Sequence, residues 1–162
     1  MTDRVIIDDS TIYFEDLREG DQFRTPARTI TEADIVAFAG LSADYNSLHV
    51  DADYALGSQY GQRIAHGLLV LAITSGLTTR LPLIMRMGPA LVGLLNLECR
   101  WSKPTFIGDT LHILVTVESL TLSSSGDKGV VMLRRDAINQ RGEQVMVSHW
   151  KILVKCRDGA AQ

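Results

Sequence analysis

The sequence predicts an α+β domain in which one antiparallel sheet wraps around a single long, buried helix. An uncharged apolar segment, Gly67 to Thr79, has the length and composition of a helix enclosed by protein. Strand-like segments then follow one another along the rest of the chain, and two of their connections are short polar turns that contain glycine. A sheet with one apolar face packed around one helix satisfies both patterns.

Length, composition and charge narrow the class of protein. The 162 residues, of which 46% are hydrophobic, fit one domain spanning 1–162 with a core of its own. We expect 1–12 to form a flexible N-terminal extension and 156–162 a flexible C-terminal tail. The formal net charge of -3, without a cluster of positive charge, argues against nucleic acid or a membrane as partner.

The cysteines and the N-terminus bear on location. Cys99 and Cys156 lie far apart in strand-like segments without a CxxC pattern, so we expect neither a disulfide framework nor a thiolate metal site. The N-terminal stretch MTDRVIIDDSTIYF carries acidic residues and no apolar signal-peptide region. These features predict a reducing compartment, and the cytoplasm is the expected location.

Short elements are predicted before the central helix. Residues 21–31 form a short strand whose proline is tolerable at the edge of a sheet. Thr31 is a suitable N-cap for the helix that follows, which has acids in its first turn and ends at Gly40. Residues 51–58 add another helical turn, begun by Asp51.

The central helix is predicted to be buried on nearly all sides. A membrane-spanning helix needs about 20 apolar residues, whereas this segment is shorter and is bordered by His66 and Arg80. Pro82 marks its end. The hinge that follows, 81–91, either packs in the core or lines an adaptable acyl-chain pocket, which its methionines would suit. The residues that cover most of the circumference of the helix are Leu68, Leu69, Leu71, Ala72, Ile73 and Leu77.

Four strands are predicted in the rest of the chain, at 90–101, 110–122, 129–138 and 143–155. The alternation of side chains between two faces is clearest in the last of them. The polar turns at 123–129 and 139–142 predict antiparallel hairpins.

The stretch GLSADYNSLHVD, residues 40–51, places Asp44, Asn46 and His49 close together after the first predicted helix. Aspartate and asparagine are common turn formers, so the stretch taken alone would more often be structural. Aspartate and histidine are also suited to acid–base catalysis. A metal site is the rival role for His49 and His66, but their spacing lacks an HxH or HxxxH pattern, and we expect no metal.

The order of the elements, together with YFEDLREGDQF, RTITEADIVAFAGLSADYNSLHVDADYA, RIAHGLL and WSKPTFIGDTL, resembles the MaoC-like dehydratases. This family includes R-specific enoyl-CoA hydratases, and the similarity runs from Tyr13 to Val154. It implies the hot-dog fold, with the sheet wrapped around the central helix. It also implies an acyl-CoA substrate, no cofactor, and a homodimer or a dimer of such dimers, with sheets joined edge to edge near the active sites.

The resemblance assigns roles to individual residues. The family signature G-D-x-N-P-hydrophobic-H appears at 43–49, where Asp44 and His49 match the catalytic pair and Asn46 a residue that shapes the loop. Ala43 replaces the glycine and Ser47 the proline, which bears on loop rigidity and substrate range. In the family, the glycine of the H-G pair donates its N–H to the thioester carbonyl, a role that falls to Gly67 here. Ser75, on the same helix, matches a supporting serine.

Hydration of a trans-2-enoyl-CoA needs a base to deprotonate water as it attacks Cβ and an acid to protonate Cα. Together Asp44 and His49 would bind one water, with His49 as the base and Asp44 as the acid, or with these roles exchanged. The reverse reaction dehydrates a (3R)-3-hydroxyacyl-CoA.

Two other functions compete with hydration. One is thioester hydrolysis, which would direct water to the carbonyl carbon, and the other is a non-catalytic acyl-thioester-binding protein. Retention of Asp44 and His49 together with the H-G pair favours hydration. An acyl carrier protein as substrate carrier would require a basic patch, and the sequence shows no clear one.

Overall fold

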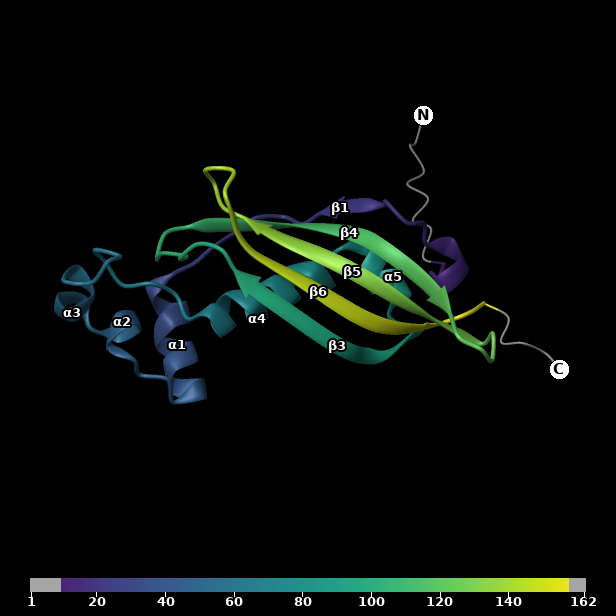
Figure 1. The fold of residues 1–162 in the computed structure, drawn as a ribbon, viewed down its shortest axis with the longest axis horizontal. Helices are drawn as coiled ribbons and strands as arrows, with labels where there is room; N and C mark the ends of the chain where they lie inside the picture. Colours follow the sequence, from purple (N-terminus) through teal and green to yellow (C-terminus); the bar gives the residue numbers. More distant parts are fainter. Residues whose placement is uncertain (1–9, 158–162) are drawn as a thin grey trace, which may run out of the picture.

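The structure is a computed structural model that describes residues 10–157 (Figure 1). A 3-10 turn, two short strands and three short helices precede the central helix α4, and a fifth helix and four long strands follow it. In order, the elements are η1 (Phe14–Asp16), β1 (Gln22–Arg24), β2 (Arg28–Thr29), α1 (Glu32–Ser42), α2 (Ser47–Val50), α3 (Ala52–Leu56), α4 (Gly67–Thr79), α5 (Pro82–Met87), β3 (Leu91–Trp101), β4 (Thr110–Leu122), β5 (Lys128–Ile138) and β6 (Gln144–Lys155).

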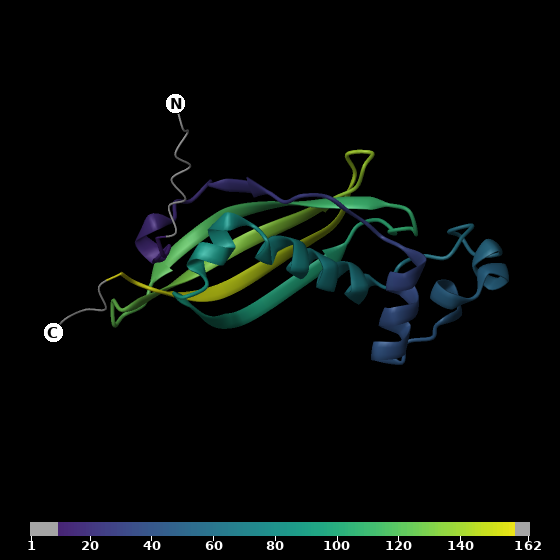
Figure 2. The same cartoon turned by 180° about the vertical axis from the view of Figure 1, so that it is seen from behind.

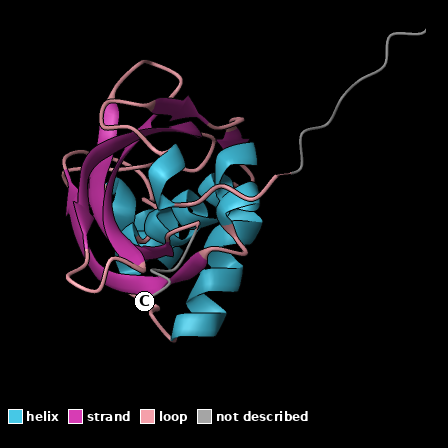
Figure 3. Cartoon of the chain, turned by 90° about the vertical axis from the view of Figure 1, so that its right-hand side faces the viewer, coloured by secondary structure: helices cyan, strands magenta, loops and turns pink. Residues whose placement is uncertain are grey.

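The four long strands and the short β1 form one antiparallel sheet in the order β1-β4-β5-β6-β3. The short strand β2 also pairs with β4. The two predicted hairpins, β4 to β5 and β5 to β6, are confirmed. The connection 102–109 carries the chain across the sheet, so that β3 pairs with β6 and forms an open edge. The sheet curves around α4, which runs along its concave face, as Figures 2 and 3 show. The predicted α+β hot-dog architecture is thereby confirmed.

The core lies between the concave face of the sheet and one side of α4. Alternate residues of β4, among them Ile113 and Val115, are fully buried, and Leu69, Val70 and Ile73 of α4 pack in the same cluster. Thr74 and Thr78 are also buried. Their hydroxyls donate to the carbonyls one turn earlier, at 2.8 and 2.7 Å, so no buried hydroxyl is left without a partner on this side.

The prediction that α4 is buried on nearly all sides is wrong for the single chain. Leu68 is 60% exposed and Ala72 is exposed, whereas Leu71 is partly covered. The exposed residues form one stripe because they are four positions apart on the helix. An apolar stripe of this kind is typical of a surface that another protein surface covers.

Three local predictions also differ from the structure. The helix expected to end at Gly40 continues to Ser42, and Ala43 ends it. The strand expected over 21–31 is interrupted around Pro26, which has no N–H for the ladder. The hinge 81–91 contains α5, whose first residue is Pro82, a position at which a helix needs no N–H donor.

The expected terminal extensions lie mostly outside the described residues. Within the described part, the Ile12 N–H donates to the Arg86 carbonyl at 3.1 Å, and the Cys156 N–H to the Asp127 carbonyl at 2.9 Å. Cys99 and Cys156 are free thiols. Burial raises the pKa of Cys156 to about 11. Among the described residues, none of the helices has the length and apolar character needed to span a membrane.

Candidate functional site

Hydrogen bonds between side chains and backbone shape the loop that carries Asp44, between α1 and α2. Ala43, which ends α1, has a φ of 59° and is the only non-glycine residue with positive φ in the described part of the chain. Asp44 Oδ1 accepts from the Asn46 N–H at 3.3 Å, and Asn46 Oδ1 accepts from the Leu48 N–H at 3.0 Å. Asn46 is therefore the N-cap of the short helix α2, on which His49 lies.

His49 and His66 form a stacked pair, with ring centroids 3.9 Å apart. His49 Nδ1 lies 2.8 Å from the Ile64 carbonyl oxygen, and His66 Nε2 lies 3.0 Å from the Asp44 carbonyl oxygen. Because a carbonyl only accepts, each of these nitrogens carries the proton in a neutral ring. The lone pairs are then on Nε2 of His49 and Nδ1 of His66, and the second of these has no hydrogen-bond partner among the described residues.

The Asp44, His49 and His66 side chains meet at one point. A carboxylate oxygen and one nitrogen from each ring all lie within 4.8 Å of one another. Asp44 is exposed, His49 is partly covered and His66 is 2% exposed. A carboxylate beside an imidazole with a free lone pair suits acid–base catalysis on a shared water. These three residues are also the ones in the site whose donor atoms suit a metal such as zinc.

Gly67, the first residue of α4, lines a cavity of about 280 Å³ that His49 also lines. The first amides of a helix lack partners within the helix and lie at its positive end, so they suit an oxygen that gains negative charge. Trp101 packs directly on this residue: its Nε1 donates to the Gly67 carbonyl at 2.9 Å. A Cβ at position 67 would lie 3.0 Å from the Trp101 ring, which explains the glycine.

Asp109 holds the neighbouring loop in place from a buried position. Its carboxylate accepts from the Phe106 N–H at 2.9 Å, from Gln140 at 2.8 Å and from Arg141 at 2.9 Å. Burial acts to raise the pKa of Asp109, but these hydrogen bonds outweigh it and hold the pKa below its ordinary value. The same loop supports the segment before α4, since the Thr105 carbonyl accepts from the Ala65 N–H at 2.8 Å.

The structure links four of the five residues that the sequence indicates through His49. Asp44 lies beside His49, Asn46 caps the helix that carries His49, and His49 lines a cavity together with Gly67. Ser75 instead lines a separate cavity two turns further along α4. From the sequence we assign neither His66 nor Trp101 a role in the site. The H-G pair identifies the position of His66 but not its stacking on His49, and no motif distinguishes Trp101 from an ordinary strand residue.

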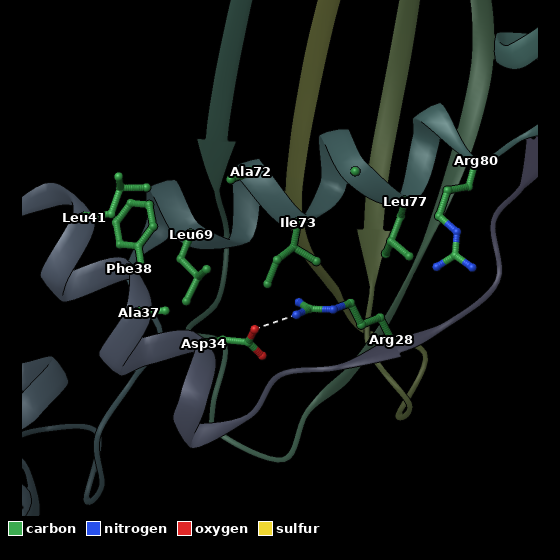
Figure 4. Close-up of a pocket in the computed structure, with 11 residues that line it drawn as sticks. Arg28, Asp34, Ala37, Phe38, Leu41, Leu69, Ala72, Ile73, Leu77 and Arg80 are labelled. Carbon is green, nitrogen blue, oxygen red and sulfur yellow. Dashed lines mark hydrogen bonds and ion pairs between the residues drawn. The ribbon is translucent and has the colours of Figure 1, made fainter.

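A larger cavity, of about 480 Å³, lies between α1 and α4 on another side of the central helix (Figure 4). Phe38, Ile73 and Leu77 form part of its apolar wall. Arg28 pairs with Asp34 at its opening, and Arg80 extends beside them. Neither the Asp44 carboxylate nor the His49 ring lines it, so this cavity is distinct from the candidate site.

Comparison with known proteins identifies the family. The model of the MaoC like domain matches residues 16–139, a stretch that includes the Asp44 loop, α4 and three of the long strands up to Asn139. The chain belongs to the MaoC-like family.

Relatives of this MaoC-like protein include proteins named as hydratases. An (R)-specific enoyl-CoA hydratase of Rhodospirillum rubrum is 45% identical over 109 residues, which cover 67% of this chain and 71% of the relative. A mesaconyl-CoA hydratase of Cereibacter sphaeroides is 31% identical over 92% of this chain, but the match covers only 43% of that relative. These relatives support an enzyme of the hydratase and dehydratase class.

Solved structures agree with the family and with the fold. The MaoC-like dehydratase from Rhodospirillum rubrum superposes with a TM-score of 0.81 at 35% identity, covering 91% of this chain and 99% of the other. A protein described as a monoamine oxidase regulatory protein from Archaeoglobus superposes with a TM-score of 0.86 at 32% identity, covering 92% and 97% of the two chains.

Proposed function

We propose that this MaoC-like protein adds water to a trans-2-enoyl-CoA, or removes it from a (3R)-3-hydroxyacyl-CoA, with Asp44 and His49 as the acid–base pair. One observation carries the proposal. The Asp44 carboxylate lies near the His49 ring, whose Nε2 lone pair is free, and His49 lines a cavity together with Gly67. Relatives named as enoyl-CoA hydratases support the reaction class.

In the hydration direction, Nε2 of His49 accepts a proton from the catalytic water as the water oxygen attacks Cβ of the enoyl group. The backbone carbonyl of Ile64 fixes the opposite nitrogen and so keeps the basic nitrogen available. Asp44 donates a proton to Cα, and transfer of a proton from His49 back to Asp44 then restores both groups for the next turnover. Dehydration is the reverse of the same transfers.

Gly67 is proposed to donate its N–H to the thioester oxygen as negative charge develops there. Gly67 lines the same cavity as His49 and is the first residue of α4, where the helix dipole adds a positive potential. Trp101 holds the Gly67 carbonyl and so positions the peptide plane. Asn46 contributes by capping the helix that carries His49.

No cofactor is needed for these steps, because the thioester itself stabilises charge at Cα. His66 places its ring against His49 and bonds the backbone of Asp44, and this contact positions both catalytic side chains. We therefore expect the Asp44, His49 and His66 cluster to work without a metal ion, and activity after exhaustive treatment with a chelator tests this expectation.

The proposed assembly is a homodimer joined through β3. This strand is the open edge of the sheet, and Val92, Leu94 and Leu95 on it are exposed. An exposed apolar edge strand is suited to pair with a second copy. The exposed stripe of α4 that begins at Leu68 would be covered at the same time. We place the protein in the cytoplasm, with CoA as the carrier.

The test is incubation of the purified protein with crotonyl-CoA and a panel of branched or carboxylated enoyl-CoAs. A hydratase removes the enoyl-thioester absorbance without releasing free thiol. Release of thiol would identify a thioesterase instead. Binding without either change would identify a non-catalytic acyl-thioester-binding protein.

A further inference from the structure

An arginine is buried on the concave face of the sheet, where the other buried positions of the same strand are uncharged. Arg135 is 5% exposed and follows Leu133 in the alternating buried positions of β5. Its partners across the sheet, Val115 and Ser148, are uncharged. An arginine in such a place is rare unless an anion compensates its charge.

No anion of the described residues compensates Arg135. Its Nε has no hydrogen-bond partner, and the described part of the chain offers its guanidinium no ion pair. Asp136, the next residue, bonds Arg134 instead. Burial lowers the pKa of Arg135 to about 10. The Trp150 ring, 3.8 Å away, covers the flat face of the guanidinium but cannot accept from its N–H groups, which lie in its plane.

Arg135 lines a cavity of about 120 Å³ between α4, α5 and the sheet. The partly exposed Ser75 lines the same cavity, so its hydroxyl can donate to a group bound there. Thr79 is there too, but its hydroxyl already donates to the Gly76 carbonyl at 2.9 Å. The remaining wall is apolar and includes Ile84 and Met87. The buried Arg135 Nε, which has no partner, in an otherwise apolar cavity indicates an acceptor that carries negative charge.

The cavity lies in line with the proposed thioester site. Gly67, Leu71, Ser75 and Thr79 are four positions apart and therefore form one continuous row that winds slowly around α4. At 1.5 Å per residue, Ser75 lies about 12 Å along the axis from Gly67. A chain that starts at the thioester carbonyl and runs along this side of the helix would thus place its far end at Ser75 and Arg135.

We propose that Arg135 and Ser75 form a carboxylate subsite for the distal end of the acyl group, so that the substrate is the CoA thioester of an enoic dicarboxylic acid. The inference rests on the proposed hydratase function. A guanidinium binds a carboxylate through two parallel N–H bonds, and the Ser75 hydroxyl donates a third. A short acyl group would leave the arginine unpaired, whereas a medium-length chain with a terminal carboxylate fills the cavity and neutralises it.

The test compares trans-2-octenoyl-CoA with trans-2-octenedioyl-CoA, which has the same chain length and a terminal carboxylate. The substrates are given to the wild-type chain, to Arg135→Met and to Ser75→Ala, with Arg134→Met as the control on the opposite face of β5. We expect wild type and Arg134→Met to favour the carboxylated substrate by about 10- to 100-fold in kcat/KM, the range of a charged hydrogen bond. Arg135→Met should abolish that preference, and Ser75→Ala should reduce it several-fold.

A binding measurement separates this inference from the hydratase proposal. Thermal stabilisation by suberyl-CoA and by octanoyl-CoA, both saturated, needs no turnover. Greater stabilisation by suberyl-CoA that disappears in Arg135→Met supports the subsite even if no enoyl-CoA is hydrated. Equal kcat/KM for the two enoyl-CoAs, or equal stabilisation by the two saturated thioesters, overturns the inference. Equal kcat/KM would leave hydration intact and would mean that water, or a carboxylate of a second copy, occupies the cavity.

Discussion

The sheet with α4 and the segment 31–66 are built from different interactions. The sheet and α4 share a continuous core of buried aliphatic residues. The segment 31–66, which lies beyond the end of the sheet in Figures 1 and 2, consists of three short helices, each capped by a side chain, namely Thr31, Asn46 and Asp51. It adds only Ile35 and Ala65 to that core, and it carries both proposed acid–base groups. Most of the core thus lies outside the segment that carries the chemistry, and most substitutions should affect the two separately.

The largest effect on stability should come from the core of the sheet. Ile113→Ala removes a fully buried side chain from β4 and should lower the free energy of unfolding by about 3 kcal/mol, within the usual 2–5 kcal/mol. Leu114→Ala, on the other face of the same strand, should cost about 1 kcal/mol or less. Urea denaturation measures both. Equal losses for the two variants would contradict the placement of the core.

A substitution at the start of α4 should affect chemistry more than stability. Gly67→Ala puts a Cβ 3.0 Å from the Trp101 ring, so the ring or the first turn of α4 must shift. Loss of an aligned oxyanion donor typically lowers kcat by about 10²- to 10³-fold. Trp101→Phe, which removes the bond to the Gly67 carbonyl and the ring atoms packed on Gly67 but leaves the backbone amide, should give a smaller loss. Enoyl-CoA kinetics would contradict this account if Gly67→Ala kept full activity.

The strained residue beside Asp44 should yield a gain in stability. Ala43 has a φ of 59°, and glycine adopts such a conformation without the cost of about 1 kcal/mol that a Cβ imposes. Ala43→Gly should therefore raise the melting temperature by a few degrees. The same change at exposed Ala37, within α1, should lower it by a similar amount. A decrease in both variants would argue against the left-handed backbone at this position.

The smallest effect should be the dependence of stability on acidic pH. Hydrogen bonds lower the pKa of Asp109, and those from Asn139, Lys103 and Arg141 lower the pKa of Glu143 to about 2. An acid whose pKa is lower in the folded state than in the unfolded state stabilises the fold at pH values above its unfolded-state pKa. This stability is lost as the pH falls through the folded-state pKa. Melting temperatures should fall below about pH 4, and the slope should be shallower for Asp109→Asn.

The sequence predicted the regular elements well because their signals are local. The bounds of α4 match the apolar segment, and the four long strands differ from the prediction by one residue at three of their eight ends, because composition and turns determine them. Pairing of β3 with β6 was not predicted, since it depends on the crossing connection 102–109. The structure buries α4 on one side, whereas the sequence predicts burial on nearly all sides. The two differ because an apolar stripe that the sheet covers and an apolar stripe that stays exposed look alike in sequence.

The candidate site was predictable only where a motif covers it. Asp44, Asn46 and His49 lie in one short signature, and Gly67 in the H-G pair. Contacts between distant segments, such as Trp101 on Gly67, have no local signal. Arg135 is the clearest case, because an alternating strand pattern suggests that a charged residue faces water, and the structure buries it.

The central claim is that Asp44 and His49 carry the acid–base steps, and single substitution of each tests it most directly. Asp44→Asn keeps the acceptor for the Asn46 N–H, and His49→Gln keeps a polar side chain. Asp51→Asn, which still caps α3, and His112→Gln on β4 are matched controls. With a good enoyl-CoA substrate, kcat should fall about 10²- to 10⁴-fold for each site variant while the controls stay near wild type. Turnover within a few-fold of wild type in both folded site variants would contradict the claim.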